Sequence, residues 1–553
     1  MGNTTSRFRE MMKTAGRRLL RGSQRLRKGA GLAHRKGPGV SLSSGLFSDT
    51  IQQNQNLPPS AHLDTPDQSP PNPDLPCADK ASRLSQSVTP LHQSHPKESG
   101  IVELSDGRAA FAARVALADA AEHTLDIQYY IWHADMTGLL LFDAIRRAAD
   151  RGVQVRLLLD DNNTTGLDPL IAGLNAHPNI QIRLFNAFRI RHWRALGYLT
   201  EFARLNRRMH NKSFTADQQV TLVGGRNIGD EYFGAGPNQL FIDLDILAIG
   251  PVVQDVSDDF ERYWTSDSAW PAEQVVLRPP SADLATLTAI KPDTAHSHLA
   301  DSYLEAITRQ SFVCNLLAGT LQFEWTSVTL ISDHPAKGLD KANKASLLWP
   351  QLQQVLDNPT QELALVSPYL VPAKAGVDAF VGLAQKGVRI TLLTNSLEAT
   401  DVVAVHAGYA KRRKPLLAAG IQIFELKRRA SVPKLRDRGL VGRSGSSLHA
   451  KVFSVDQSHV FVGSFNFDPR SRHLNTEMGF LIASPRLAAR IAHNIQNLTS
   501  THAYQVQAGS GHTLKWLEGT PPRQIEHHQE PGATVWRRLA TNLIARLPIE
   551  WLL

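Results

Sequence analysis

The sequence has few cysteines and no long apolar run, and each absence excludes a class of protein. Its 553 residues include two cysteines, Cys77 and Cys314, which cannot form a disulfide framework, and it contains no CxxC pair for a zinc site. This cysteine content fits a reducing compartment. No run of 18 or more apolar residues occurs, so we expect no transmembrane helix. The N-terminus also lacks the apolar stretch of a secretory signal.

Positive charge is concentrated at one end of the chain. The net charge is +9, but residues 1–36 carry +10 from eleven Lys and Arg and one acid, and residues 37–100 carry −3, which leaves only +2 on residues 101–553. A nearly neutral body is a weak basis for a nucleic-acid groove, and we expect no nucleic-acid partner. The segment GRRLLRGSQRLRK is amphipathic and would suit an anionic membrane surface. A solvated basic tail explains it equally well.

Composition divides the chain into five regions. We expect a basic amphipathic tail at 1–37 and a disordered linker rich in Pro, Ser and Gln at 38–99. Two domains follow at 100–300 and 301–505, with a C-terminal extension at 506–553.

The two domains share one pattern of strands and helices. In the first, the patterns predict a helix at 107–122, a strand at 125–132, a helix at 137–152 and a buried strand at 153–161. Residues 361–396 repeat the strand, the helix and the buried strand at an offset of about 235. The sequence therefore predicts an α/β fold of two tandem domains related by a pseudo-two-fold axis.

A nine-residue pattern occurs in both halves. Residues 209–217 read MHNKSFTAD and residues 448–456 read LHAKVFSVD, and GGRN or GSFN follows each at the same distance. A histidine and a lysine two positions apart share one face of an extended segment. A structural strand does not need this set of side chains twice, so the repetition indicates a catalytic site. Its candidates are His210, Lys212, Asp217, His449, Lys451 and Asp456, with Asn227 and Asn466 downstream.

Acidic residues further along also correspond. DLDILAIGP begins at Asp243 and EMGFLIASP begins at Glu477, at an offset of 234. Asp245 falls opposite Gly479 in this alignment, so the repeat selects Asp243.

The repeated pattern H-x-K-x4-D-x6-G-[GS]-x-N resembles that of the phospholipase D superfamily. Within it, GSFNFDPRSRHLNTEMGF, TNSLEATDVVAVHAGYAKRRKPLL and the ending LPIEWLL are similar to bacterial cardiolipin synthases, in particular the cardiolipin synthase C branch. The resemblance covers about residues 100–500 and implies two phospholipase D-like domains, each a mixed sheet flanked by helices.

The resemblance implies roles for the repeated residues. One neutral histidine attacks phosphorus while the other, protonated, donates to the leaving oxygen. Family precedent makes His210 the nucleophile and His449 the acid and base. The alignment pairs Asp243 with His210 and Glu477 with His449 as orienting carboxylates.

Supporting contacts are expected from other residues. Lys212, Lys451, Asn227 and Asn466 would bind the phosphate oxygens. Asp217 and Asp456 lie toward the end of each strand, where support of the fold is the favoured alternative to a catalytic role. Head-group contact and ordinary packing explain four further residues about equally: Tyr369, His406, Asp468 and Arg470.

The implied reaction is phosphatidyl transfer to phosphatidylglycerol. The donor would be phosphatidylethanolamine or a second phosphatidylglycerol, and the products cardiolipin and ethanolamine or glycerol, with no metal or cofactor. A hydrolase releasing phosphatidic acid would use the same residues, and a nuclease is disfavoured by the +2 body. A lipid-binding scaffold is disfavoured because both histidine–lysine pairs are intact. The sequence identifies no activating protein partner.

The C-terminal residues 535–553 indicate membrane contact. They place Trp536, Leu539, Leu543, Leu547 and Trp551 at spacings of three and four, with arginines between them. A helix of this kind can lie in a membrane interface, although docking on the protein core is the alternative. We therefore expect a peripheral protein at the cytoplasmic face of a bacterial inner membrane.

Overall fold

The computed structural model describes residues 81–191, 193–235, 242–276, 312–356, 358–428, 448–547 and 550. The chain divides into two compact units, Met1–Leu57 and Pro58–Leu553, and all described residues belong to the second. The predicted basic tail lies outside the described residues, as do residues 38–80 of the predicted linker. Within the described part, no helix is both long and apolar enough to span a membrane.

The first half is built on a mixed sheet. Its nine strands among the described residues run in the order β8-β4-β3-β2-β5-β6-β7-β1-β9. The parallel strands β2, β3 and β4 are flanked by antiparallel ones. The bounds are β1 Ser99–Leu104, β2 Thr124–Tyr129, β3 Gln154–Asp160, β4 Ile180–Phe185, β5 Ser213–Ala216, β6 Val220–Gly224, β7 Asp245–Ile249, β8 Ala269–Pro271 and β9 Glu324–Thr326.

The second half repeats this arrangement. Its ten described strands run in the order β10-β16-β15-β14-β11-β12-β13-β17-β18-β19, so eight of them correspond in position to the first sheet without β9. Parallel β11, β12 and β13 again lie together. The bounds are β10 Val328–Ser332, β11 Glu362–Val366, β12 Arg389–Asn395, β13 Gln422–Leu426, β14 Val452–Val455, β15 His459–Gly463, β16 Met478–Ile482, β17 Ala503–Ala508, β18 Leu514–Glu518 and β19 Ile525–His527.

Helices cover one face of each sheet and fill the space between the halves. On the outer face of the first sheet lie α3 (Gly107–Ala120), α4 (Met136–Asp150) and α5 (Asp168–Asn175). Helix α14 (Ala373–Gln385) packs in the second half as α4 does in the first. Gly152 and Gly387, with φ of 99° and 90°, end these helices and turn the chain into β3 and β12.

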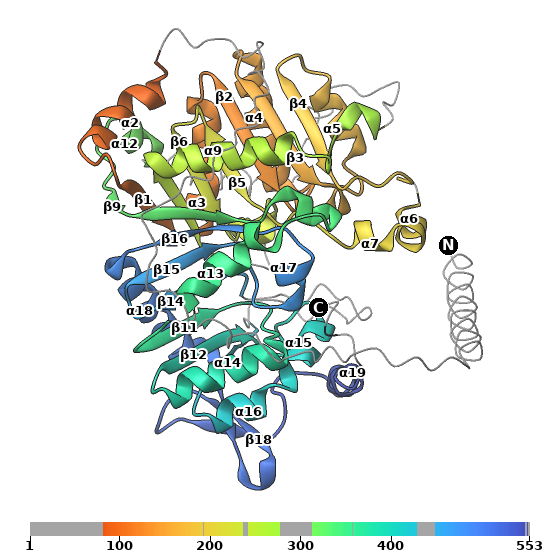
Figure 1. Ribbon diagram of the computed structural model, residues 1–553, viewed down its shortest axis with the longest axis vertical. Helices are drawn as coiled ribbons and strands as arrows, with labels where there is room; N and C mark the ends of the chain where they lie inside the picture. The colour runs from red at the N-terminus through yellow and green to blue at the C-terminus, as the bar shows by residue number, and fades with distance from the viewer. Residues whose placement is uncertain are drawn as a thin grey trace, which may run out of the picture. The chain divides into compact units, whose positions relative to one another are not determined.

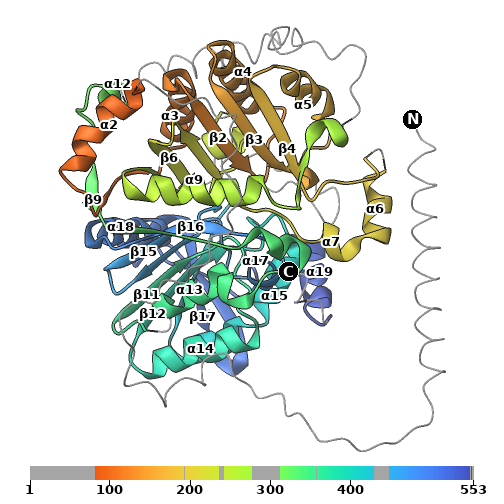
Figure 2. The same ribbon diagram turned by 45° about the horizontal axis from the view of Figure 1, so that its top comes forward.

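One apolar cluster joins the two halves. Helices α9 (Pro251–Trp264) and α18 (Pro485–His502) contribute buried side chains to it from equivalent positions. Alternating residues of β7 divide between the layers: Leu247 and Ile249 face the outer helices, while Ile246 and Ala248 face the shared cluster. Figures 1 and 2 show the two halves in contact, and in Figure 2 α9 runs along their boundary.

Three predicted boundaries differ from the structure. Strand β9 pairs with β1 in the first sheet and the second sheet begins at Val328, so the sheets change over later than residue 300. The boundary at 505 falls inside β17, and β17 to β19 extend the second sheet. Residues 83–93 of the predicted linker form helix α2 (Arg83–Gln93). Leu84 and Val88 are the buried residues of α2. Two buried apolar positions in eleven residues do not stand out from the polar composition of the linker, so the helix was not predicted.

Candidate active site

Each histidine–lysine pair precedes a short strand that ends in a tight hairpin. Lys212 is followed by the four residues of β5, and Asp217 opens the turn into β6. Asp217 and Gln218 have φ of 49° and 54°, so both central residues of the turn that Gln219 N closes on Ala216 O at 2.9 Å are in the left-handed conformation. Lys451, β14 and Asp456 repeat this arrangement, with φ of 50° at Asp456. The spacing from lysine to aspartate is therefore the length of one strand.

The backbone at the start of each motif crosses to the other half. His210 N donates to Thr476 O at 2.8 Å, and His449 N donates to Ile242 O at 2.9 Å. Thr476 and Ile242 each directly precede one of the two candidate orienting acids. Each histidine is thereby placed beside the acid of the opposite half.

The carboxylates consequently pair with the histidines in a crossed manner. His210 Nδ1 lies 2.7 Å from Glu477 Oε2, and His449 Nδ1 lies 2.6 Å from Asp243 Oδ2. The predicted pairing of Asp243 with His210 and of Glu477 with His449 is wrong. Sequence alignment identifies equivalent positions, but the crossing of the backbone between the halves decides which acid each imidazole meets.

Each carboxylate is fixed by a further contact that differs between the halves. Ser464 Oγ donates to Glu477 Oε2 at 2.5 Å, whereas Asp243 Oδ1 accepts from Leu244 N at 2.8 Å. Gly225 stands at the position equivalent to Ser464. A Cβ there would lie 2.1 Å from Asp243 Oδ1, so the GGRN segment requires glycine where GSFN carries serine.

The electrostatics of the two pairs are unequal. Burial, reinforced by the nearby lysines, holds the pKa of His210 well below its usual value. Burial also raises the pKa of Glu477 to about 7. Burial and Lys451 lower the pKa of His449. For Asp243, burial is outweighed by His449, and its pKa lies below the usual range. The Asp243 carboxylate is therefore ionised over a wider pH range than the Glu477 carboxylate.

Both lysines fold back onto their histidines. Lys212 Nζ donates to His210 O at 2.5 Å, and Lys451 Nζ donates to His449 O. Lys451 Nζ also lies 3.1 Å from each ring nitrogen of His449. Burial lowers the pKa of Lys212 well below its usual value and that of Lys451 to about 8. The four cationic or titrating groups thus form one buried cluster at the boundary of the halves.

Asn227 and Asn466 are buried at equivalent positions. Asn227 Oδ1 accepts from Ile131 N at 3.2 Å, and its Nδ2 donates to Tyr232 OH at 3.1 Å. Asn466 N donates to Ser471 Oγ at 3.3 Å. These contacts hold the loops in place, and binding of phosphate oxygens by the two amides stays a prediction.

Asp217 and Asp456 bind backbone amides at the start of a neighbouring strand. The Asp217 carboxylate accepts from the N–H groups of Glu122, His123 and Thr124 at 2.8–3.2 Å. The Asp456 carboxylate accepts from the N–H groups of Thr360, Gln361 and Glu362 at 2.8 Å. The structure places both in the fold-supporting role and gives neither a contact with the histidines.

Comparisons with known proteins point to one family. A sequence profile described as "Cardiolipin synthase, PLD-like domain" matches residues 115–264 and 352–499. Cardiolipin synthase C of Escherichia coli is 49% identical over 472 residues, which cover 85% of this chain and 100% of that protein. Cardiolipin synthase A of Pseudomonas entomophila is 26% identical over 395 residues, 71% of this chain and 67% of that protein.

The chain belongs to the cardiolipin synthase family. The family lies within the phospholipase D superfamily, and the chain is accordingly an enzyme of the phosphatidyltransferase class. The crystal structure of phosphatidylserine synthase from Haemophilus influenzae has a TM-score of 0.51 at 13% identity, covering 77% of this chain and 92% of that one. This likeness shows a shared fold. The predicted family and the predicted α/β fold with two domains are confirmed.

Two tyrosines of this cardiolipin synthase site were missed from the sequence. The Tyr130 ring meets His210 edge-on at 4.9 Å between centroids, and Tyr232 meets His449 in the same way at 5.1 Å. Tyr130 follows β2 directly, and Tyr232 lies in α8 (Asp230–Phe233), five residues after Asn227. The two positions are not equivalent in the repeat, so the alignment offered no signal for them.

Asp468 and Arg470 make structural contacts near the boundary between the two halves. Asp468 caps α17 (Pro469–His473) by accepting from Ser471 N at 2.7 Å, and burial raises its pKa to about 6. Arg470 donates to Asn206 Oδ1 at 2.8 Å across the boundary. The described contacts favour packing over head-group binding for both.

Tyr369 and His406 are also held by neighbouring acids. Tyr369 OH donates to Asp401 Oδ2 at 2.8 Å. His406 Nε2 lies 3.3 Å from Glu530 Oε1 and is almost fully buried. This burial fits a histidine packed in the protein core better than a histidine that contacts substrate.

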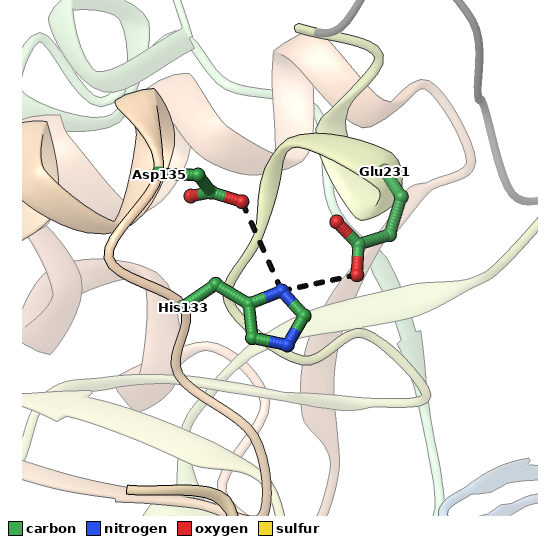
Figure 3. Close-up of side chains that lie close together, drawn as sticks. All are labelled: His133, Asp135 and Glu231. Carbon is green, nitrogen blue, oxygen red and sulfur yellow. Dashed lines mark ion pairs between the residues drawn. The ribbon is translucent and has the colours of Figure 1, made fainter. Parts of the chain in front are cut away.

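Among the residues that the structure describes, two groups of side chains have donor atoms close enough to hold a metal ion. Figure 3 shows the first, in which His133 Nδ1 lies 3.2 Å from Glu231 Oε1 and 3.9 Å from Asp135 Oδ2. Asp135 also accepts from Gly138 N and Asp230 N, so the fold itself holds this carboxylate. The second group is His406, Glu425 and Glu530, where Arg413 donates to both glutamates.

Proposed function

We propose that this chain synthesises cardiolipin by transferring a phosphatidyl group to phosphatidylglycerol through a phosphohistidine. The observation that carries the proposal is the pair of imidazoles, each held at Nδ1 by a carboxylate of the other half. An imidazole bound at Nδ1 has its Nε2 available for chemistry. Two such nitrogens at one boundary supply the nucleophile and the acid of a two-step transfer.

In the first step, His210 Nε2 attacks the phosphorus of the donor lipid. An N–P bond forms, the P–O bond to the leaving alcohol breaks, and His449 gives its proton to the leaving oxygen. Lys212 and Lys451 balance the negative charge that develops on the non-bridging oxygens. The product is ethanolamine or glycerol, according to whether the donor is phosphatidylethanolamine or phosphatidylglycerol.

In the second step, a primary hydroxyl of phosphatidylglycerol attacks the phosphohistidine. His449, now neutral, accepts the hydroxyl proton, the N–P bond breaks, and cardiolipin forms. Exclusion of water until the lipid hydroxyl arrives separates this transfer from hydrolysis.

The assignment of His210 as nucleophile is supported by the unequal electrostatics. A nucleophilic imidazole has to be neutral, and burial holds the pKa of His210 well below its usual value. The pKa of His449 is also lowered by burial and Lys451, but less than that of His210 because the Asp243 carboxylate offsets part of the effect, so His449 holds a proton the more readily of the two. His449 therefore acts as acid and then as base.

The site of action we propose is the cytoplasmic face of a bacterial inner membrane, with phospholipids as substrates and peripheral attachment. Support comes from the names of the relatives and from the amphipathic C-terminal residues, which include helix α19 (Val535–Ile544).

The test is product identification with purified protein and labelled phosphatidylglycerol, with and without phosphatidylethanolamine. Cardiolipin is the expected product, and co-release of labelled glycerol or of ethanolamine identifies the donor. Phosphatidic acid alone would instead assign a hydrolase, and nicked DNA without any lipid product would assign a nuclease.

The matched variants are His210→Ala and His493→Ala. His493 is an exposed histidine on α18 and its removal should leave the rate unchanged. His210→Ala should abolish cardiolipin formation, and a wild-type rate in this variant would refute the site.

A further inference from the structure

Helix α19 has its apolar side chains on the outside. Val535, Trp536, Leu539 and Leu543 are 53–80% exposed. Its inward side includes polar groups: Thr541 is 3% exposed, and an Arg537 side-chain N–H donates to Thr400 O at 2.8 Å. Ala540 and Ile544 are half-buried on the same helix. A helix of a soluble protein normally buries its apolar face, so this orientation is reversed. The sequence left open that this apolar face docks on the protein core. In the structure the face is exposed instead.

The same reversal occurs in the first half. Helices α6 (Arg194–Thr200) and α7 (Phe202–Leu205) with the preceding residue expose Trp193 (67%), Leu199 (78%) and Phe202 (45%). Polar side chains face inward instead. Arg194 donates to Asp161 O at 2.6 Å, and Tyr198 OH donates to Asn162 Oδ1 at 2.7 Å. Exposed apolar groups on this scale mark an interaction surface.

The two exposed patches lie on the same side of the described structure, one in each half, in both Figure 1 and Figure 2. The first patch is close to a catalytic histidine along the chain, and the second is hydrogen-bonded to the loop that holds Tyr369. Helix α7 ends at Leu205, five residues before His210. Helix α19 is tied to Thr400, next to Asp401, which binds the Tyr369 hydroxyl.

Arginines accompany both patches. Arg189 precedes the first, and Arg538 and Arg546 belong to the second. None of these three arginines forms an ion pair with a carboxylate of the described residues. Apolar and aromatic side chains flanked by unneutralised arginines complement an anionic lipid interface, where tryptophan is favoured.

We propose that the 193–202 patch and the 535–547 patch form one two-part docking surface for an anionic phospholipid bilayer. The first patch comprises Trp193, Leu196, Leu199 and Phe202, and the second comprises Val535, Trp536, Leu539, Leu543 and Leu547. Both halves of the composite site are then held against the surface that contains the lipids. The inference deepens the proposed function and rests on its lipid substrates, but binding can be measured without catalysis.

The test uses the full chain and vesicles of phosphatidylcholine with or without phosphatidylglycerol, in a co-sedimentation assay. The variants are Trp193→Ser with Leu199→Ser, Trp536→Ser with Leu543→Ser, and all four together. Ile525→Ser is the matched control, because Ile525 is 56% exposed on β19, outside both patches. Each double variant should weaken binding to anionic vesicles about tenfold or more, and the fourfold variant further, with Ile525→Ser unchanged.

The other outcomes overturn the proposal. Wild-type binding in the double variants, or an effect from one patch alone, would contradict a two-part surface. A dimeric wild type that becomes monomeric in the variants while vesicle affinity is kept would assign the patches to contact between copies of the chain.

Two readouts separate this inference from the proposed function. The His210→Ala protein should bind vesicles as tightly as the wild type, which shows that docking does not depend on chemistry. The patch variants should keep the wild-type rate on a dispersed short-chain phosphatidylglycerol. Loss of that rate together with binding would indicate damage to the fold and refute the assignment.

Discussion

Glu477 and Asp243 have unequal tasks although they occupy equivalent positions. Glu477, whose pKa burial raises to about 7, holds His210, the imidazole that the proposed mechanism uses as nucleophile. Asp243, whose pKa lies below the usual range, holds His449, the imidazole that the proposed mechanism uses as acid and base. Pairs of titratable groups whose environments separate their pKa values identify acid and base. The two-fold repeat is thus symmetric in backbone and asymmetric in proton affinity.

The pH dependence of kcat/KM follows from two of these groups. As the pH falls through about 7, Glu477 takes up a proton, its O–H competes for His210 Nδ1, and the rate falls. As the pH rises through about 8, Lys451 loses its charge and the rate falls again. The pKa of His449 also lies below its usual value, so the proton that it must donate is lost at a lower pH than the charge of Lys451, and we expect a narrow bell whose maximum lies below about pH 8. Glu477→Gln should lose the acid limb, and a flat profile between about pH 6 and 9.5 would contradict the assignment.

Gly225 is a second residue whose identity the site requires. In Gly225→Ala the new Cβ would lie 2.1 Å from Asp243 Oδ1, so the carboxylate must move away from His449. Displacement of about 1 Å can cost about a hundredfold in rate, and we expect a loss of about 10- to 100-fold in kcat. Gly173→Ala in α5 is the control, because a Cβ there meets nothing within 4 Å. Equal kcat in the two variants would show that Asp243 is not positioned by this contact.

At this scale the sequence predicted which histidines and acids lie together at the boundary of the halves but not how they pair. The repetition identified both histidines, both lysines and both acids because equivalent positions are visible in one chain. The crossed pairing depends on His210 N meeting Thr476 O in the other half, a contact between residues 266 apart that no local pattern encodes. Tyr130 and Tyr232 were missed for the same reason, as each meets its histidine from a non-equivalent position.

At the scale of elements, the hairpin after each motif sets the position of the histidine and lysine. Asp217 ties the β5–β6 turn to the start of β2 by accepting from three backbone N–H groups. In Asp217→Ala these part-buried donors lose a charged acceptor, at a cost of about 1–3 kcal/mol in the free energy of unfolding. Thermal or denaturant unfolding measures this loss, and kcat of the folded protein should stay within about twofold.

Asp217→Asn is the matched variant for that prediction. It keeps an acceptor oxygen and tolerates the left-handed backbone, so it should be less destabilised than Asp217→Ala. An Asp217→Ala protein of wild-type stability but without activity would instead assign the carboxylate a direct catalytic role.

Most elements of the sheets were predictable, and the exceptions have physical causes. The helices at 107–122 and 137–152 correspond to α3 and α4, because apolar periodicity and Gly152 mark their extent. Strand β9 has three residues and α2 buries two apolar side chains, so neither leaves a clear periodic signal. The amphipathic pattern of α19 was visible, but which face would point outward was decided only by packing.

At the scale of the molecule, the duplication makes each half dependent on the other. The shared apolar cluster of α9 and α18 holds the sheets together, and the crossed backbone bonds bring each acid to the opposite histidine. Each half therefore lacks a complete histidine–carboxylate pair by itself.

In the proposed mechanism Glu477 serves the attacking histidine and Asp243 the proton-donating one. The most direct measurement compares Glu477→Gln and Asp243→Asn on a phosphatidyl donor and on one with a nitrophenol leaving group, which departs without protonation. On the lipid, both variants should lose about 10²- to 10⁴-fold in rate. On the nitrophenyl donor, the release of nitrophenolate is measured in the first turnover, because the second step still needs His449 as base. This release should recover to near the wild-type rate in Asp243→Asn and stay slow in Glu477→Gln. Recovery of Glu477→Gln with Asp243→Asn still slow would contradict the crossed assignment.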